Sequence, residues 1–277
     1  QMELLIKEIL NNKEVAALPG LLDSGGLPAL ISGLSPVHRA NLASALAMET
    51  DSALFVVCPD DSAAENFARD ARAMLGREVN LLLMRDFTFN PTQAVSRQVE
   101  QKRISTLHQL MSGESPVTVA SISALMQRTL PKETLGRASM SLEMGAAVDM
   151  EAVEQSLLSC GYVKSPQVEG PGQFARRGGI LDFFSPAESH PVRMEFWGDE
   201  IDSMGYFDIS TQRRVENAEK CLILPAAESL PSLAEGGLES LCGRLENLAV
   251  KYARKRSSEN ASALAALMRA DAEKLRS

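Results

Sequence analysis

The 277-residue chain is 45% hydrophobic and 23% charged, which is enough apolar material for one large domain or for two to three small ones. Its formal net charge of −8 argues against binding nucleic acid over a broad surface, although a local basic patch would be compatible with it. No apolar run approaches the roughly 20 residues that a membrane-spanning helix needs. The composition therefore predicts a globular protein that does not enter a membrane.

The cysteines and histidines are scattered along the chain and share no metal-ligand spacing. We therefore expect reduced thiols in a cytoplasmic protein, with neither a disulfide framework nor a metal site. The first twelve residues predict a short amphipathic helix, and they lack the basic region, apolar core and cleavage site of a signal peptide. The cysteines are Cys58, Cys160, Cys221 and Cys242, and the histidines are His38, His108 and His190.

Residues 31–47, ISGLSPVHRANLASALA, predict a strand, a loop and a helix, which is the order in which a nucleotide-binding protein holds its phosphate loop. Such a loop reads G-x-x-x-x-G-K-[ST], because glycine amides wrap the phosphates, lysine neutralises them and the hydroxyl binds magnesium. Gly33 fits the first glycine, but His38, Arg39 and Ala40 stand at the other three positions. The segment is therefore either an ordinary turn or a degenerate phosphate loop. Neither interpretation predicts ATP binding, so no cofactor is expected.

The stretch up to about residue 128 alternates strands with helices. Short apolar runs predict buried strands at 54–58, 79–84 and 116–121, and helical spacing of apolar residues predicts helices between them. Strands that are separated by helices imply parallel pairing with helices on both faces of the sheet. We therefore expect an α/β domain in the first part of the chain.

The middle stretch, 129–219, changes character. One helix from Asp149 to Cys160 is followed by short alternating strands and dense turn signals, which predicts an inserted α+β domain with antiparallel hairpins. The last stretch, 220–277, begins with an apolar strand at 221–226 that we expect to close the parallel sheet. It then ends in two predicted helices, 237–256 and 259–276.

A row of polar and aromatic residues marks the insert. In HPVRMEFW, period-two alternation puts three apolar side chains on one face of a strand and Arg193, Glu195 and Trp197 on the other. Just upstream, the pattern places Arg176 and Arg177 on opposite faces of a neighbouring strand. Arginine and tryptophan dominate protein–protein hot spots, because they offer large contact area and many donors. The row predicts a partner surface, and the alternative is a solvated face with one incidental aromatic residue.

Two further motifs have simple interpretations. DEID at 199–202 has the form of a helicase magnesium box, but no apolar strand leads into it, and Gly198 with Asp199 predicts a hairpin turn. KYARKR at 251–256 has four basic residues at a helix end. These residues would either complement the helix dipole or contact DNA phosphates.

Several ordered stretches together resemble the N-terminal region of the bacterial transcription-repair coupling factor (Mfd) family, which is in turn similar to the excision-repair subunit UvrB. The resemblance covers essentially the whole chain and is weakest towards its C-terminus. The stretches are GYVKSPQVEGPGQF at 161–174, RRGGILDFF at 176–184, PVRMEFWGDEIDS at 191–203, DISTQRR at 208–214 and LPAAE at 224–228.

The resemblance implies a degenerate RecA-like parallel-sheet domain made of residues 1–128 and 220–277, with 129–219 inserted as a domain that binds UvrA. UvrB keeps an intact phosphate loop where this chain has GLSPVHRA. The departure at that loop therefore favours the coupling-factor family over UvrB.

The family's UvrA-contact positions fall on Arg177, Arg193 and Trp197 of this sequence, and the alternation adds Glu195. The family position matched by Trp197 is often phenylalanine, so an aromatic anchor is retained. The resemblance thus strengthens the expectation of a partner surface that the alternation alone had raised.

The implied function is that of a non-catalytic adaptor that recruits UvrA to stalled RNA polymerase. We expect the chain to be the N-terminal part of a longer ATP-dependent DNA translocase, whose motor and polymerase-binding domain lie further on. RNA polymerase and double-stranded DNA would then be partners of the full-length protein. Two alternatives stay open, namely a UvrB-like ATP-dependent subunit that binds damaged DNA, and a RecA-like domain that only regulates the motor.

Overall fold

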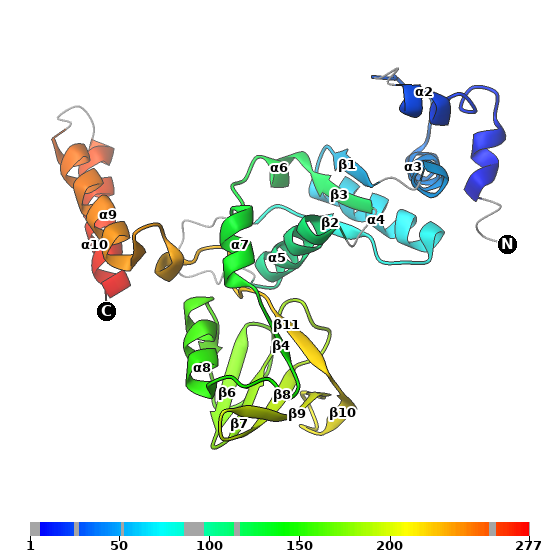
Figure 1. Ribbon diagram of the computed structural model, residues 1–277. Coiled ribbons are helices and arrows are strands. Elements are labelled where there is room, and N and C mark those ends of the chain that lie inside the picture. The colour runs from blue at the N-terminus through cyan, green and yellow to red at the C-terminus, as the bar shows by residue number, and fades with distance from the viewer. Residues whose placement is uncertain are drawn as a thin grey trace. The chain divides into compact units, whose positions relative to one another are not determined.

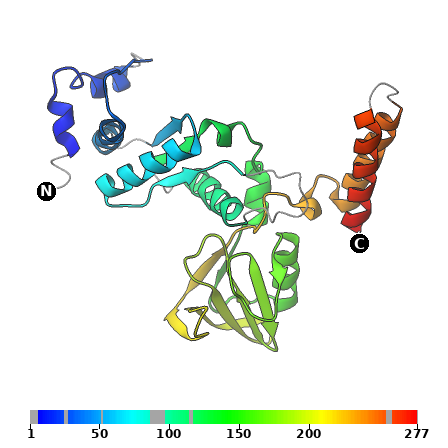
Figure 2. The same ribbon diagram turned by 180° about the vertical axis from the view of Figure 1, so that it is seen from behind.

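The structure is a computed structural model that describes residues 6–24, 28–50, 53–85, 97–113, 117–254 and 259–276. The chain forms two compact units, Gln1–Thr129 and Leu130–Ser277 (Figures 1 and 2). The α/β class predicted from the sequence is confirmed, because a parallel sheet lies in the first unit and an antiparallel sheet in the second. None of the described helices has both the length and the apolar character needed to cross a membrane.

The first unit contains a three-stranded parallel sheet in the order β1-β3-β2, which confirms the predicted parallel pairing. Helix α4 connects β1 to β2 along the chain, and the segment between β2 and β3 contains helix α5. The elements are η1 (Glu8–Asn11), α2 (Leu18–Ser24), α3 (Pro36–Thr50), β1 (Leu54–Cys58), α4 (Asp61–Leu75), β2 (Asn80–Leu82), α5 (Arg97–Ser112), β3 (Val117–Ser121) and α6 (Ile122–Leu125).

Helix α4 shows why these elements form. The Asp60 side chain accepts a hydrogen bond from the backbone amide three residues on (2.8 Å), which caps the helix, and Gly76 ends it at a φ of +62°. Ala64, Ala68 and Ala71 form its buried stripe against the sheet. Small side chains at this spacing let the helix approach the strands closely.

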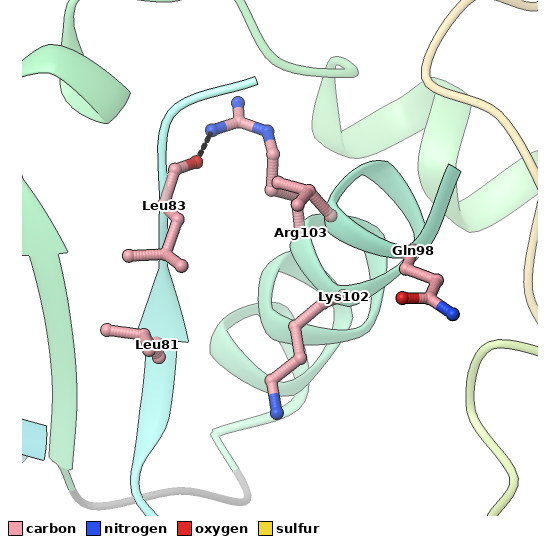
Figure 3. A pocket seen from close by; sticks show the side chains of 6 residues that line it. Leu81, Leu83, Gln98, Lys102 and Arg103 are labelled. Atoms are coloured by element: carbon pink, nitrogen blue, oxygen red, sulfur yellow. Dashed lines mark hydrogen bonds between the residues drawn. The ribbon is translucent and has the colours of Figure 1, made fainter. Parts of the chain in front are cut away.

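The two edges of the parallel sheet differ. At the β2 edge, Arg103 of α5 donates a hydrogen bond to the carbonyl of Leu83 (2.6 Å), as Figure 3 shows, and Thr106 donates to the carbonyl of Leu81 (3.2 Å). These bonds satisfy backbone groups that an edge strand would otherwise expose. Strand β1 has no strand partner on its other side within the described part of the chain.

The strand predicted in front of the degenerate phosphate loop does not form. Residues 28–35 lie outside any strand, and Leu30 is 96% exposed. Gly33, at a φ of +80°, then turns the backbone into α3.

The second unit holds a six-stranded sheet in the order β10-β9-β8-β7-β6-β5, antiparallel except for the β5–β6 pair. The predicted helix and hairpin strands of the insert are confirmed. The elements are α7 (Lys132–Ala138), β4 (Met140–Glu143), α8 (Met150–Ser159), β5 (Val163–Lys164), β6 (Gln173–Arg177), β7 (Ile180–Phe183), β8 (Val192–Trp197), β9 (Glu200–Phe207), β10 (Arg214–Asn217), β11 (Lys220–Ile223), η2 (Pro231–Leu233), α9 (Gly237–Ala253) and α10 (Glu259–Arg276).

Helix α8 covers one face of this sheet, which we call the inner face (Figure 1). Val153 and Leu157 of the helix are buried in the same core as Phe174, Leu181 and Met194 of the strands. We call the opposite face of the sheet the outer face.

The apolar strand at 221–226 does not close the parallel sheet as expected. Strand β11 instead pairs antiparallel with β4, with Cys221 opposite Leu142, in a sheet of two strands. This short pairing buries Cys221 and Ile223 in the core of the second unit, so the apolar pattern is satisfied without the parallel sheet. The two predicted C-terminal helices are confirmed as α9 and α10, and their assignment to the RecA-like domain stays a prediction.

Candidate protein-interaction site

Strand β8 places its polar residues on the outer face of the six-stranded sheet. The side chains of Val192 and Met194 are fully buried in the core, whereas Arg193, Glu195 and Trp197 project from the opposite face. The extra residue at the irregularity between β8 and β9 lies on β9, so the alternation of β8 continues to its end. The predicted division of this strand into two faces is confirmed.

Strand register aligns outer-face residues into rows that cross the sheet. Arg177 of β6 lies opposite Ile180 of β7, Ile180 lies opposite Glu195 of β8, and Glu195 lies opposite Ser203 of β9. Directly opposed residues in antiparallel strands have neighbouring side chains. Residues far apart in the sequence thus form one continuous strip.

A second row contains a buried carboxylate. Asp182 lies opposite Arg193 and is only 1% exposed. Its Oδ1 accepts a hydrogen bond from Arg193 Nε (2.7 Å), and its Oδ2 accepts one from Arg193 Nη2 (2.8 Å) and one from Arg177 Nη2 (2.6 Å). We call these three residues the carboxylate clamp.

The two arginines of the clamp are not equally accessible. The Arg177 side chain is 48% exposed, whereas that of Arg193 is 18% exposed. Arg193 lies over the Phe207 ring at 4.6 Å and donates from Nη1 to the carbonyl of Gln212 (3.2 Å). Hydrogen bonding to Asp182 raises the pKa of Arg193. Arg193 lies on the predicted face but is largely covered, so Arg177 offers the accessible guanidinium.

Trp197 ends β8 and is 83% exposed. Gly198, at a φ of +62°, starts the turn that leads into β9 at Glu200. The hairpin turn predicted at Gly198 and Asp199 is therefore confirmed, and DEID does not follow an apolar strand end. An aromatic side chain this exposed at the end of a sheet is available to a partner.

Glu195 already has a neighbour of opposite charge. Arg214 of β10 reaches across β9, and its Nη2 lies 3.3 Å from Glu195 Oε1 and 2.7 Å from Ser203 Oγ. Gly205 leaves room for this approach, since a Cβ at that position would lie 2.7 Å from the Glu216 carbonyl oxygen and 2.9 Å from Arg214 Nε. The pair is half exposed, so it can exchange partners at low cost.

Arg176, next to Arg177 in the chain, points to the inner face. Its Nη1 lies 3.0 Å from Glu154 Oε2 on α8, and Lys164 Nζ lies 2.5 Å from Glu154 Oε1. Hydrogen bonds from Lys164 and then from Arg176 lower the pKa of the Glu154 carboxyl. The predicted placement of Arg176 and Arg177 on opposite faces is confirmed.

Comparison with known proteins classifies the sheet that carries this site. Residues 140–228 match the family model of the UvrB interaction domain. The chain is 29% identical over 208 residues to the transcription-repair-coupling factor of Bacillus subtilis, and 32% identical over 206 residues to that of Myxococcus xanthus. It is also 35% identical over 141 residues to the factor of Escherichia coli. The chain is a relative of the transcription-repair-coupling factors.

The likeness covers most of this chain but little of its relatives. The aligned stretches are 75%, 72% and 51% of the chain, and 18%, 17% and 12% of the Bacillus, Myxococcus and Escherichia proteins. The UvrB interaction domain contains all four residues predicted to contact a partner, namely Arg177, Arg193, Glu195 and Trp197. It also contains every residue of the carboxylate clamp.

Sequence reasoning missed the clamp and its surroundings. Alternation along ILDFF at 180–184 sets Asp182 on the outer face with Arg177 and Arg193. Strand order was needed to see that one carboxylate serves both arginines. The contact between Arg214 and Glu195 could not be predicted from the sequence, because it depends on the close approach of Arg214 over Gly205.

The segment predicted as a degenerate phosphate loop gathers no comparable site among the described residues. Helix α3 begins at Pro36, so His38, Arg39 and Ala40 lie within the helix. Ala40 is fully buried, His38 Nδ1 lies 2.9 Å from Ser35 Oγ, and Arg39 Nε donates to the carbonyl of Leu34 (3.1 Å). A cavity of about 620 Å³ lies between α3, β1 and α4, and of the four predicted loop positions only Arg39 lines it.

The remaining candidates contribute no chemistry to the site. All four cysteines are free and buried, and burial raises the pKa of the Cys221 thiol to about 12. Lys251 lies in the last turn of α9, which fits the helix-dipole interpretation of the basic segment, while residues 255 and 256 lie outside the described residues. Among the residues that the structure describes, no three His, Cys, Asp or Glu side chains cluster to hold a metal ion.

Proposed function

We propose that the outer face of the UvrB interaction domain binds UvrA, and that the chain acts as a non-catalytic adaptor which recruits UvrA during transcription-coupled repair. The observation that carries this proposal is Trp197, an 83% exposed tryptophan within the matched domain. It lies on the same face as an accessible arginine, Arg177. Aromatic and arginine side chains of this kind form the centres of protein interfaces.

The four predicted contact residues have different parts in this proposal. Trp197 would fill an apolar pocket on UvrA, and Arg177 would pair with an acidic group. Glu195 would exchange its contact with Arg214 for one with the partner. Arg193 can offer only its uncovered edge, because Asp182 and Gln212 occupy most of its donors.

We further propose that this chain neither binds nor hydrolyses ATP. His38, Arg39 and Ala40 provide no glycine cradle, no lysine and no magnesium hydroxyl, and α3 begins before all three positions. RNA polymerase and double-stranded DNA would be partners of the longer proteins that this chain resembles, through sequence outside these 277 residues.

Calorimetric titration of purified UvrA with the 277-residue chain tests the adaptor function. We expect saturable binding by the wild-type chain and loss of most of the affinity in a chain carrying Trp197→Ala and Arg177→Ala. Trp197 is exposed, and Asp182 keeps its two hydrogen bonds from Arg193 when Arg177 is removed, so thermal unfolding should stay cooperative. Absence of binding by the wild-type chain, or equal binding by the double variant, would contradict the proposal.

The same preparation tests the alternative of a UvrB-like ATP-dependent subunit. Titration with ATP and magnesium should give no heat of binding. Measurable ATP affinity would favour that alternative and would overturn the non-catalytic part of the proposal.

A further inference from the structure

The carboxylate clamp sits directly under the surface that we propose binds UvrA, and the following inference rests on that proposed function. Asp182 is buried, yet the guanidinium of Arg177 that it holds is about half exposed. A buried charge is costly unless it is paired and hydrogen-bonded. Asp182 is both, since its two oxygens accept three hydrogen bonds from the two arginines.

Arg193 is held by contacts with three residues. Its guanidinium lies over Phe207, is hydrogen-bonded to Asp182 through two nitrogens, and donates to the carbonyl of Gln212. Gln212 has a φ of +59°, which is uncommon for a residue other than glycine. The turn is held by Asp208, whose backbone carbonyl accepts from the Gln212 amide (2.8 Å). Arg193 is therefore a rigid internal counter-charge for Asp182.

Arg177 depends on Asp182 in a different way. The Arg177 side chain donates one hydrogen bond among the described residues, from Nη2 to Asp182 Oδ2 (2.6 Å). A free arginine side chain samples many rotamers, and ordering it on binding costs conformational entropy. Because Arg177 is already held in the free chain, a partner meets an ordered guanidinium on a side chain that is 48% exposed.

We infer that Asp182 is the positioning residue of the partner surface: it holds Arg177 in the conformation that binds UvrA, and Arg193 serves this surface chiefly by holding Asp182. Arg177 touches the partner, whereas Asp182 acts through it.

Charge alone predicts the opposite effect of removing Asp182. Two guanidiniums share one carboxylate, so Asp182→Asn raises the positive charge of the surface by one. If Arg177 acted only through long-range attraction to acidic groups, this substitution would strengthen binding. If Asp182 positions Arg177, the same substitution weakens binding, because the strong charge-assisted bond is lost. The sign of the change therefore separates the two accounts.

A double-mutant cycle on the 277-residue chain tests the inference. We expect Asp182→Asn to weaken UvrA binding by about ten-fold, and Asp182→Asn combined with Arg177→Ala to be no weaker than Arg177→Ala alone. Additive effects of the two substitutions, or tighter binding by Asp182→Asn, would overturn the inference. The matched control is Asp202→Asn, which removes an exposed carboxylate from β9 and should leave affinity within about two-fold of wild type.

A second measurement decides the question if Asp182→Asn fails to unfold cooperatively. The side-chain NMR signals of Arg177 in the wild-type chain, without partner, should report an ordered guanidinium. A freely rotating Arg177 would contradict positioning by Asp182.

The two proposals fail in different ways. If the wild-type chain does not bind UvrA, the proposed function is wrong, and the NMR measurement still shows whether Asp182 orders Arg177. If Trp197→Ala weakens binding but Asp182→Asn does not, the function stands and the positioning role is wrong.

Discussion

The degenerate phosphate loop and the outer face of the UvrB interaction domain handle polar residues in opposite ways. In the loop segment, His38 and Arg39 bond to their own local backbone or side chains, and Ala40 is packed into the core. On the outer face, the buried Asp182 accepts a hydrogen bond from the half-exposed Arg177. The side chains of His38 and Arg39 thus serve the start of α3, whereas Arg177 is hydrogen-bonded to Asp182 and stays accessible. The proposed function therefore rests on the outer face rather than on the loop segment.

The largest expected effect comes from removing the aromatic anchor. Trp197→Ala should weaken UvrA binding by about 2 kcal/mol or more, because a large apolar contact is lost at the interface. Trp197→Phe should retain most of the affinity. Calorimetric titration measures both, and Val215→Ala, which truncates a 61% exposed residue on β10, is the matched control. If Trp197→Ala and Val215→Ala behave alike, the interface lies elsewhere.

Restoring the phosphate-loop consensus should not restore nucleotide binding. A chain with His38→Gly, Arg39→Lys and Ala40→Thr should still show no heat on titration with ATP and magnesium, because α3 occupies the backbone that would have to wrap the phosphates.

The single substitution Ala40→Thr should lower the free energy of unfolding by about 1–3 kcal/mol, since it places a hydroxyl at a fully buried position. Urea unfolding measures this loss. ATP binding by the triple variant would show that the loop differs from a working one only in side chains.

The neighbouring arginines Arg176 and Arg177 offer a matched pair on opposite faces. Arg177→Ala should weaken UvrA binding by about 1–2 kcal/mol and should also lower the free energy of unfolding by about 1 kcal/mol, because the buried Asp182 loses one partner and keeps Arg193. Arg176→Ala should lower the free energy of unfolding by about 1 kcal/mol, because Glu154 loses a partner, and should leave binding unchanged. Titration and urea unfolding of both variants give the comparison. Weaker UvrA binding by Arg176→Ala, or unchanged binding by Arg177→Ala, would contradict the division into inner and outer faces.

The smallest expected effect concerns pH. The folded-state pKa of Glu154 is lowered by hydrogen bonds from Lys164 and Arg176, so its contribution is present above the unfolded pKa and is lost as pH falls through the folded value. Between about pH 5 and pH 3, the free energy of unfolding should fall more for wild type than for Glu154→Gln, because the glutamine has no charge to lose. Urea unfolding at both pH values tests this, with the exposed Glu169→Gln as control. Parallel profiles for wild type and Glu154→Gln would exclude this role.

The sequence predicted what depends on short-range pattern. Apolar runs located β1, β2 and β3, and the alternation in HPVRMEFW assigned the faces of β8. It failed where pairing between distant segments decides the outcome. The apolar pattern at 221–226 is the same for a parallel core strand as for β11, and only the pairing with β4 distinguishes them.

The site shows the same limit. Arg177, Arg193, Glu195 and Trp197 were identified from residue types and resemblance, but their exposure was not. Whether an arginine is a free contact or a buried counter-charge depends on Asp182 and on the turn at Gln212. Those neighbours are set by strand order and by a local backbone conformation, neither of which a single-sequence pattern specifies.

The chain contains one tryptophan, so a fluorotryptophan label reports on Trp197 alone. Titrating the labelled chain with unlabelled UvrA and following the fluorine NMR signal is the most direct test of the proposed surface. The account predicts a saturable change in the signal with the same dissociation constant that calorimetry gives. UvrA binding that leaves the Trp197 signal unchanged would contradict it.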